Sequence, residues 1–146
     1  MDRLLLLVPT TTYRAAPFSD AARALGVAVT IASEKPSTLE ELRPAELLTL
    51  DFSRPEAAAE QASAFARQHP LQAVLAVDDG ATEAAAAIAE RLGLSHHSRE
   101  AVAAARDKLR CREVLGAANL PQPAWRLVTD GDDPVEVARE LAAGGN

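Results

Sequence analysis

Short apolar runs alternate with helical segments along the first 92 residues, and this alternation constrains the fold more than any other feature. The runs have the length of buried strands and are rich in leucine, valine and isoleucine; they lie at residues 3–8, 27–32, 47–50 and 71–77. Helical patterns fill residues 15–25, 55–69 and 82–92. Strands that alternate with helices form βαβ units. We therefore expect an α/β fold, an open parallel sheet with helices on both faces and right-handed crossovers.

Residues at the ends of these segments support the same boundaries. Gly26 follows the first helical pattern, where a left-handed C-cap is favoured. Two capping boxes, in which a serine is followed three residues later by glutamate, pair Ser37 with Glu40 and Ser53 with Glu56. They predict a short helix after Ser37 and the start of the helix over residues 55–69.

The pattern changes after residue 93. Helical segments are expected from Ser98 to about residue 118, followed by a proline-containing break at 119–123, a strand at 125–128 with Trp125 in the core, and a helix that Asp133 caps. We interpret residues 1–97 as one domain, 98–121 as a helical linker, and 122–146 as the first strand and helix of a second, truncated domain.

Composition excludes several classes of function. The 146 residues carry a net charge of −6 with a pI near 5.0, and aromatic residues make up 3%, which argues against nucleic acid as a partner. The single cysteine excludes an internal disulfide framework. The longest apolar run is far shorter than the roughly 18 residues of a membrane span, and the N-terminal run is too short for a signal peptide. We expect a cytoplasmic protein with no membrane partner.

Polar residues follow two of the expected strands, where parallel sheets bind ligands. Thr10, Thr11 and Thr12 either donate hydrogen bonds to a small ligand or only satisfy the loop backbone. Asp78 and Asp79 could bind a metal, hold a hydroxyl group or cap the next helix, and capping is the favoured interpretation. The first loop lacks the glycines of a dinucleotide fingerprint, and the sequence contains no Walker A motif.

Three further residues attract functional interpretations that we judge weaker. His96 and His97 are adjacent, so their side chains should point to opposite sides, and no third metal ligand is near in sequence. A polar loop is the favoured interpretation. Cys111 lies between two arginines without a histidine at helical spacing, which favours an inert thiol.

A cluster of Arg106, Asp107 and Lys108 lies at a seam between two helical segments. It belongs to an ordered series of residues that ends in a leucine-proline-x-proline motif. The series comprises Leu92, Gly93, Leu94, Ser98, Glu100, Ala101, Val102, Arg106, Asp107, Lys108, Arg112, Leu115, Leu120, Pro121 and Pro123. This pattern resembles the segment between the Rossmann-like pre-ATP-grasp domain and the ATP-grasp domain in ligases of the biotin-carboxylase and carbamoyl-phosphate-synthase-like branch.

The resemblance implies an ATP-dependent ligase, in which ATP and Mg²⁺ convert a carboxylate to an acyl phosphate that an amine or similar nucleophile attacks. It implies that Lys108 contacts an ATP phosphate. By position, it makes Thr10, Thr11, Thr12, Asp79 and Glu83 candidate substrate contacts. His96 and His97 depart from the family pattern, which often has glycine-asparagine or histidine-asparagine there.

In the family, the catalytic residues and magnesium ligands lie beyond the part that this chain matches. We therefore expect no catalytic or metal-binding residue here, no tightly bound cofactor, and no activity without a C-terminal ATP-grasp domain. An unpaired strand at 125–128 could also pair with a second copy in a homodimer. The alternative is a stand-alone Rossmann-like module that binds or senses a small molecule without catalysis.

Overall fold

The computed structural model describes residues 2–10 and 15–144, and its centre is a parallel sheet of four strands. The strands are β1 (Arg3–Leu7), β2 (Ala28–Ser33), β3 (Leu47–Thr49) and β4 (Ala73–Ala76), in the order β3-β2-β1-β4. Every pair is parallel, with Leu5 of β1 opposite Thr30 of β2 on one side and Val74 of β4 on the other. The predicted sheet is confirmed, although β4 begins two residues later than expected.

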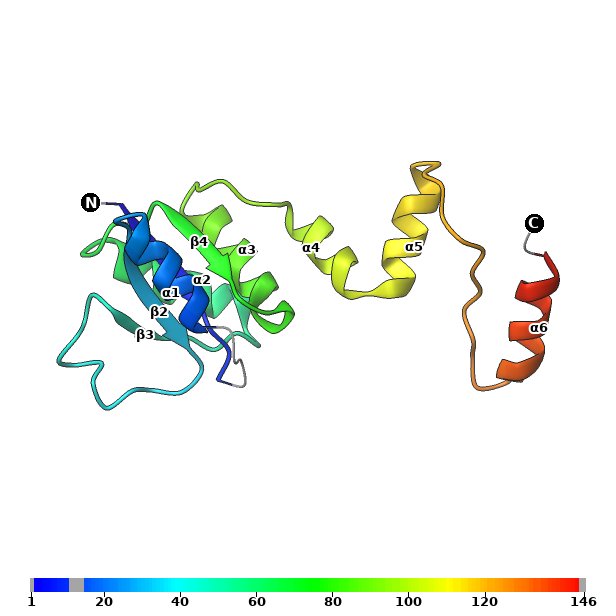
Figure 1. Ribbon diagram of the computed structural model, residues 1–146, viewed down its shortest axis with the longest axis horizontal. Coiled ribbons are helices and arrows are strands. Elements are labelled where there is room, and N and C mark those ends of the chain that lie inside the picture. The colour runs from blue at the N-terminus through cyan, green and yellow to red at the C-terminus, as the bar shows by residue number, and fades with distance from the viewer. Residues whose placement is uncertain (1, 11–14, 145–146) are drawn as a thin grey trace. The chain divides into compact units, whose positions relative to one another are not determined.

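Helices cover both faces of this sheet (Figure 1). They are α1 (Ala15–Ala24), α2 (Pro55–Ala66) and α3 (Thr82–Arg91), and a 3₁₀ turn, η1 (Asp79–Ala81), precedes α3. Successive residues of β1 point to opposite faces. Leu5 and Leu7 are fully buried against α2 and α3, whereas Leu6 is buried on the face where Phe18 of α1 packs. The alternation along one strand thus builds two hydrophobic layers.

The connection between β2 and β3 is made of turns, so the helix expected after Ser37 is wrong. Ser37 does accept a hydrogen bond from the Leu39 amide at 3.2 Å. Glu40, however, accepts hydrogen bonds from the Thr49 amide (3.1 Å) and hydroxyl (2.6 Å). The Glu40 carboxylate, which a capping box would require, is therefore bound to Thr49 of β3 instead.

One buried polar group also holds this connection. Thr30 is fully buried, and its hydroxyl donates to the Ala45 carbonyl at 2.7 Å. The Arg3 guanidinium donates to the same carbonyl at 2.6 Å and to the Thr30 hydroxyl at 3.1 Å. These bonds satisfy a hydroxyl whose burial would otherwise destabilise the fold.

Helix ends agree with the sequence at most positions. Gly26 and Gly93 adopt positive φ angles of 67° and 65° after α1 and α3, as left-handed C-caps do. The Ser53 capping box is wrong, because the Ser53 amide and hydroxyl both donate to Asp51, at 3.0 and 2.6 Å. Arg54 occupies the N-cap of α2.

The chain divides into two compact units, Met1–Ala103 and Ala104–Asn146. Helix α4 (Arg99–Arg106) begins in the first unit, and its first residue, Arg99, forms ion pairs with Glu56 of α2 and Glu90 of α3. The Ser98 hydroxyl caps α4, as expected, by accepting a hydrogen bond from the Ala101 amide at 3.1 Å.

The second unit contains α5 (Lys108–Ala117) and α6 (Pro134–Gly144). Asp133 caps α6, as expected, accepting from the Val135 amide at 2.8 Å. The strand expected at 125–128 is wrong: these residues are extended but pair with no strand in the described part of the chain. Trp125 is 37% exposed and does not enter the core. A strand requires a hydrogen-bonded neighbour, and apolar composition alone does not supply one.

Candidate functional site

The carboxyl ends of β1, β2 and β4 lie at one edge of the sheet, because the strands are parallel. The segments that follow them bring polar residues to this edge. The exposed Thr10 follows β1, and its amide donates to the Glu34 carboxylate after β2 at 3.0 Å. Thr11 and Thr12 lie outside the described residues. The edge is therefore the place where a ligand of such a sheet would bind.

After β4, the chain turns through η1 into α3. Asp78 is half-buried and Asp79 is exposed, and the Thr82 hydroxyl donates to the Asp79 carbonyl at 2.8 Å. Asp78 occupies the N-cap of η1, but its side chain forms no capping hydrogen bond, and Ala81 occupies the N-cap of α3. The favoured capping interpretation is therefore wrong for Asp78, and the Asp79 carboxylate is open to solvent. Glu83 is half-buried in the first turn of α3.

Lys108 is the first residue of α5 and is exposed. The preceding Asp107 is the N-cap, and its carboxylate accepts a hydrogen bond from the Arg110 amide at 3.1 Å. Asp107 thus has a structural role, as the N-cap of α5, that the sequence analysis did not assign to it. Lys108 lies in a basic stretch that also contains Arg106, Arg110 and Arg112. Such a stretch at a helix N-terminus is favourable for a phosphate.

The described residues contain no group of three or more histidine, cysteine, aspartate or glutamate side chains arranged to hold a metal ion. The basic stretch around Lys108, in contrast, has the charge that a nucleotide phosphate requires.

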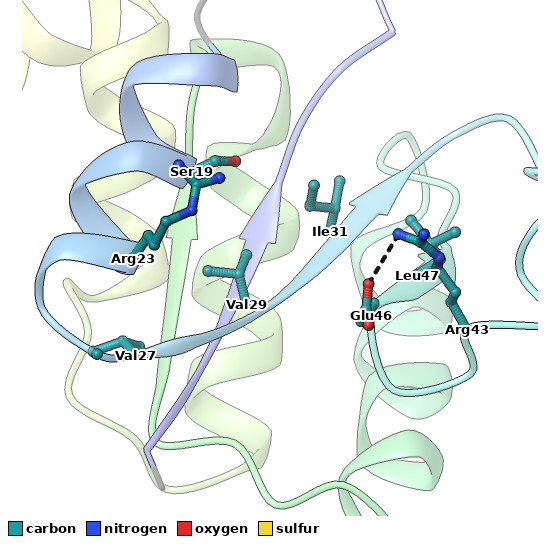
Figure 2. Close-up of a pocket in the computed structure, with 9 residues that line it drawn as sticks. Ser19, Arg23, Val27, Val29, Ile31, Arg43, Glu46 and Leu47 are labelled. Atoms are coloured by element: carbon teal, nitrogen blue, oxygen red, sulfur yellow. Dashed lines mark hydrogen bonds and ion pairs between the residues drawn. The ribbon is translucent and has the colours of Figure 1, made fainter.

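A groove on the α1 face of the sheet was not foreseen from the sequence (Figure 2). Its volume is about 380 Å³, and Val29 and Ile31 of β2 form part of its floor. Figure 2 shows Arg23 and Arg43 on opposite sides of this floor. Arg23 pairs with Asp20 at 2.8 Å and Arg43 with Glu46 at 3.3 Å. Both cations are thus matched by adjacent acids, and the groove lies on the sheet face rather than at the strand ends.

His96 and His97 lie in an irregular segment before α4, as the polar-loop interpretation predicts. Both are among the residues that line one cavity beside β4 and α3. Strict alternation of side chains holds for strands, and this segment is not a strand, so the expectation that the two rings point to opposite sides stays a prediction. Cys111 is a half-buried residue of α5.

Comparison with known proteins identifies the family. Residues 19–96, more than half of the chain, match the sequence profile of the ATP-grasp N-terminal domain. The chain therefore belongs to the ATP-grasp N-terminal domain family, and the resemblance found from its sequence is confirmed. No curated protein matches the sequence.

Two solved structures share the fold. One is phosphoribosylglycinamide synthetase from Anaerococcus prevotii, with 19% identity, a TM-score of 0.66, and coverage of 96% of this chain and 35% of that one. The other is the L-amino acid ligase from Bacillus licheniformis, with 17% identity, a TM-score of 0.66, and coverage of 98% and 42%. This chain thus spans less than half the length of either protein. No helix among the described residues is both long and apolar enough to cross a membrane.

Proposed function

We propose that this chain is the substrate-binding N-terminal part of an ATP-dependent carboxylate ligase. The observation that carries the proposal is the match of residues 19–96 to the ATP-grasp N-terminal domain. The two solved structures with this fold are, by their names, a synthetase and a ligase. In this proposal a carboxylate is activated as an acyl phosphate and then attacked by an amine or a similar nucleophile, and the enzyme works in the cytoplasm.

The strand-end edge is the proposed substrate side. Thr10 and Asp79 are exposed there, on segments that follow two adjacent strands. An amide or hydroxyl of the first segment can donate to a carboxylate, and the Asp79 carboxylate can accept from an amine. Thr11, Thr12 and Glu83 complete the proposed set by position.

Lys108 is the proposed phosphate contact. ATP, when bound, would supply the phosphoryl group that activates the carboxylate. The exposed Lys108 ammonium, at the start of α5 and among arginines, would attract a phosphate as a point charge. Because the described residues form no metal site, magnesium ligands in this proposal come from an ATP-grasp domain outside the chain.

The test is ATP titration of the 146-residue chain and of a longer protein that carries an ATP-grasp domain after it. We expect weak or no ATP binding by the 146 residues and magnesium-dependent binding by the longer protein. Lys108→Ala should weaken ATP binding there by about 1–3 kcal/mol, the scale of a lost charge-assisted contact. Lys108→Arg should restore binding only in part. Tight ATP binding by the 146 residues, or unchanged affinity in Lys108→Ala, would contradict this assignment.

A homodimer is a second possibility for the extended segment at 125–128. The side chains of Trp125, Leu127 and Val128 are 37%, 52% and 45% exposed, and such a segment can pair with a strand of another chain. Sedimentation analysis of the 146 residues tests this: a monomer at all concentrations would contradict the dimer.

A further inference from the structure

A cavity of about 400 Å³ lies in the first unit, between the edge strand β4, helix α3 and the segment that leads into α4. Its lining comes from three successive segments of the chain, between residues 74 and 102. The lining residues are Val74, Leu75, Ala76, Thr82, Ala85, Ala86, Ala89, Ser95, His96, His97 and Val102.

The shape of this cavity follows from the residues on one face of α3. Positions 82, 85, 86 and 89 share a helical face, and they hold one threonine and three alanines. Larger side chains at these positions would fill the space. On β4, Leu75 is 42% exposed, which is high for a leucine on a strand and provides an apolar surface.

The segment over residues 95–97, which forms part of the lining, is held in place at both ends. Arg99, the first residue of α4, forms ion pairs with Glu56 of α2 and Glu90 of α3. The Ser98 hydroxyl also caps α4. Residues 95–97 are therefore held at their far end by side-chain contacts and at their near end by the left-handed turn at Gly93.

The lining has no aspartate, glutamate, lysine or arginine, and seven of its eleven residues are apolar. An apolar group gains free energy on entering such a space, whereas a full charge would lose its hydration without gaining a partner. The cavity thus favours the uncharged, apolar part of a ligand and leaves a charged group outside.

His96 and His97 add polar groups to the lining of this cavity. His96 Nδ1 donates to the His97 carbonyl at 2.6 Å, which leaves His96 Nε2 for another partner. The His97 ring has no hydrogen bond to any residue that the structure describes. The Thr82 hydroxyl donates to Asp79, so its oxygen can still accept. Ligand pockets commonly combine apolar walls with a few such polar groups.

We propose that this cavity binds the apolar body, aromatic or branched aliphatic, of a small organic acid. This inference rests on the proposed function, because it assigns the acid to the ligase substrate. Thr82 connects the cavity to the strand-end edge, since it lies between Asp79 and Glu83 in sequence and also lines the cavity. The acid's apolar body lies in the cavity, and its carboxylate faces the strand-end edge.

The test is an NMR titration of the 146-residue chain, without ATP, with phenylacetate as the probe. The chain has three histidines, so their ring signals can be followed individually, and His69, which packs on Phe65, serves as an internal control. We expect phenylacetate to shift the ring signals of His96 and His97 but not His69. Acetate, which lacks the apolar body, should shift none of them. Equal shifts at all three rings, or equal effects of the two acids, would overturn the proposal.

Variants make the test specific. Ala85→Leu fills the cavity and should weaken phenylacetate binding by about tenfold or more. Ala101→Leu is the matched control on exposed α4 surface and should bind within about twofold of the parent chain. His97→Ala, at an exposed position that should not disturb folding, is expected to weaken binding several-fold. Unchanged binding in His97→Ala and in a folded Ala85→Leu would overturn the proposal.

The ligase proposal and the cavity proposal can fail independently, and the two failures give different results. Phenylacetate binding with this pattern, in a protein whose longer form does not activate acids with ATP, would refute the ligase proposal and support the cavity. An active ligase whose KM for phenylacetate is the same with Ala85→Leu would overturn the cavity and leave the ligase proposal standing.

Discussion

The buried hydroxyl of Thr30 helps to hold the connection between β2 and β3 in place. It donates to the Ala45 carbonyl and accepts from Arg3, so the end of the segment between β2 and β3 is held against β2. Sequence reasoning assigned Thr30 only to a strand. Threonine is common in strands, and nothing local shows that its hydroxyl finds a partner 15 residues later.

Replacing this hydroxyl should therefore destabilise the fold. Thr30→Val keeps the shape but leaves the Arg3 guanidinium without one acceptor, and we expect the free energy of unfolding to fall by about 1–2 kcal/mol. Urea denaturation measures this value. Arg3→Met should cost less in the Thr30→Val background than in the parent chain, because the two side chains are coupled. Full additivity of the two changes would contradict the hydrogen-bond account.

Asp51 provides a test by pH. The Ser53 hydroxyl, followed by the Ser53 amide, lowers the pKa of the Asp51 carboxyl from its ordinary value of 3.8. A lowered pKa in the folded state stabilises the fold above pH 3.8, and this contribution is lost as the pH falls towards the folded-state value. Ser53→Ala should raise the pKa of Asp51, as measured by NMR titration of the carboxyl carbon.

Asp132 is the control in the same experiment. Hydrogen bonds from the Thr129 amide and hydroxyl lower the pKa of its carboxyl in a similar way. Ser53→Ala should leave the pKa of Asp132 unchanged, because the two carboxylates belong to different units. A shift of both values, or of neither, would mean that Ser53 does not set the pKa of Asp51.

At the scale of elements, the glycine C-caps at Gly26 and Gly93 were predictable, whereas the two serine capping boxes, which are equally local signals, did not form. Gly93 has a φ of 65°, and an added Cβ there would meet no atom within 4 Å. Gly93→Ala should thus cost about 1–2 kcal/mol of folding free energy from backbone strain alone. Gly80→Ala, equally open but without a positive φ, should be neutral or slightly stabilising. Thermal unfolding compares the two; equal losses would rule out backbone strain as the cause.

Elements that depend on distant partners were not predictable in the same way. The parallel sheet followed from the alternation of helices with short, continuously apolar runs, which are typical of strands in a parallel sheet. The helix after Ser37 did not form, since Glu40 binds Thr49 instead. The extended segment at 125–128 has the composition of a strand but pairs with no other segment among residues 2–10 and 15–144. The composition of a segment indicates which secondary structure it favours. A strand forms only where another segment is present to pair with it.

The candidate site shows the same limit. The strand-end positions of Thr10 and Asp79 followed from a general rule about parallel sheets, whereas the role of Lys108 rests on the family resemblance and stays a prediction. The cavity at His96 and His97 was missed because its lining comes from residues 74–76, 82–89 and 95–102. The adjacency of His96 and His97 in the sequence did not indicate that both residues line the same cavity. The small residues at 82, 85, 86 and 89 were the only sequence sign that α3 leaves space there.

At the scale of the whole molecule, the division into two units has a measurable consequence. Residues of the first unit include the sheet and its two hydrophobic layers, whereas no residue of α5 is buried. Limited proteolysis should therefore cut first between residues 107 and 133 and leave a resistant fragment that ends near residue 103. Mass spectrometry identifies the cut sites. Early cleavage within α2 or α3 would contradict the assignment of the stable core to the first unit.

The strand order also determines when the sheet can be completed during synthesis. β1 precedes the other three strands in the sequence, yet it lies inside the sheet and pairs with both β2 and β4. The Arg3 amide donates to Gln72, which is 69 residues further along the chain. At about 5–20 residues per second, this partner emerges roughly 3–14 seconds later. Throughout that interval the apolar strand β1 has at least one unpaired edge, so the four-stranded sheet can be completed only after β4 has been made.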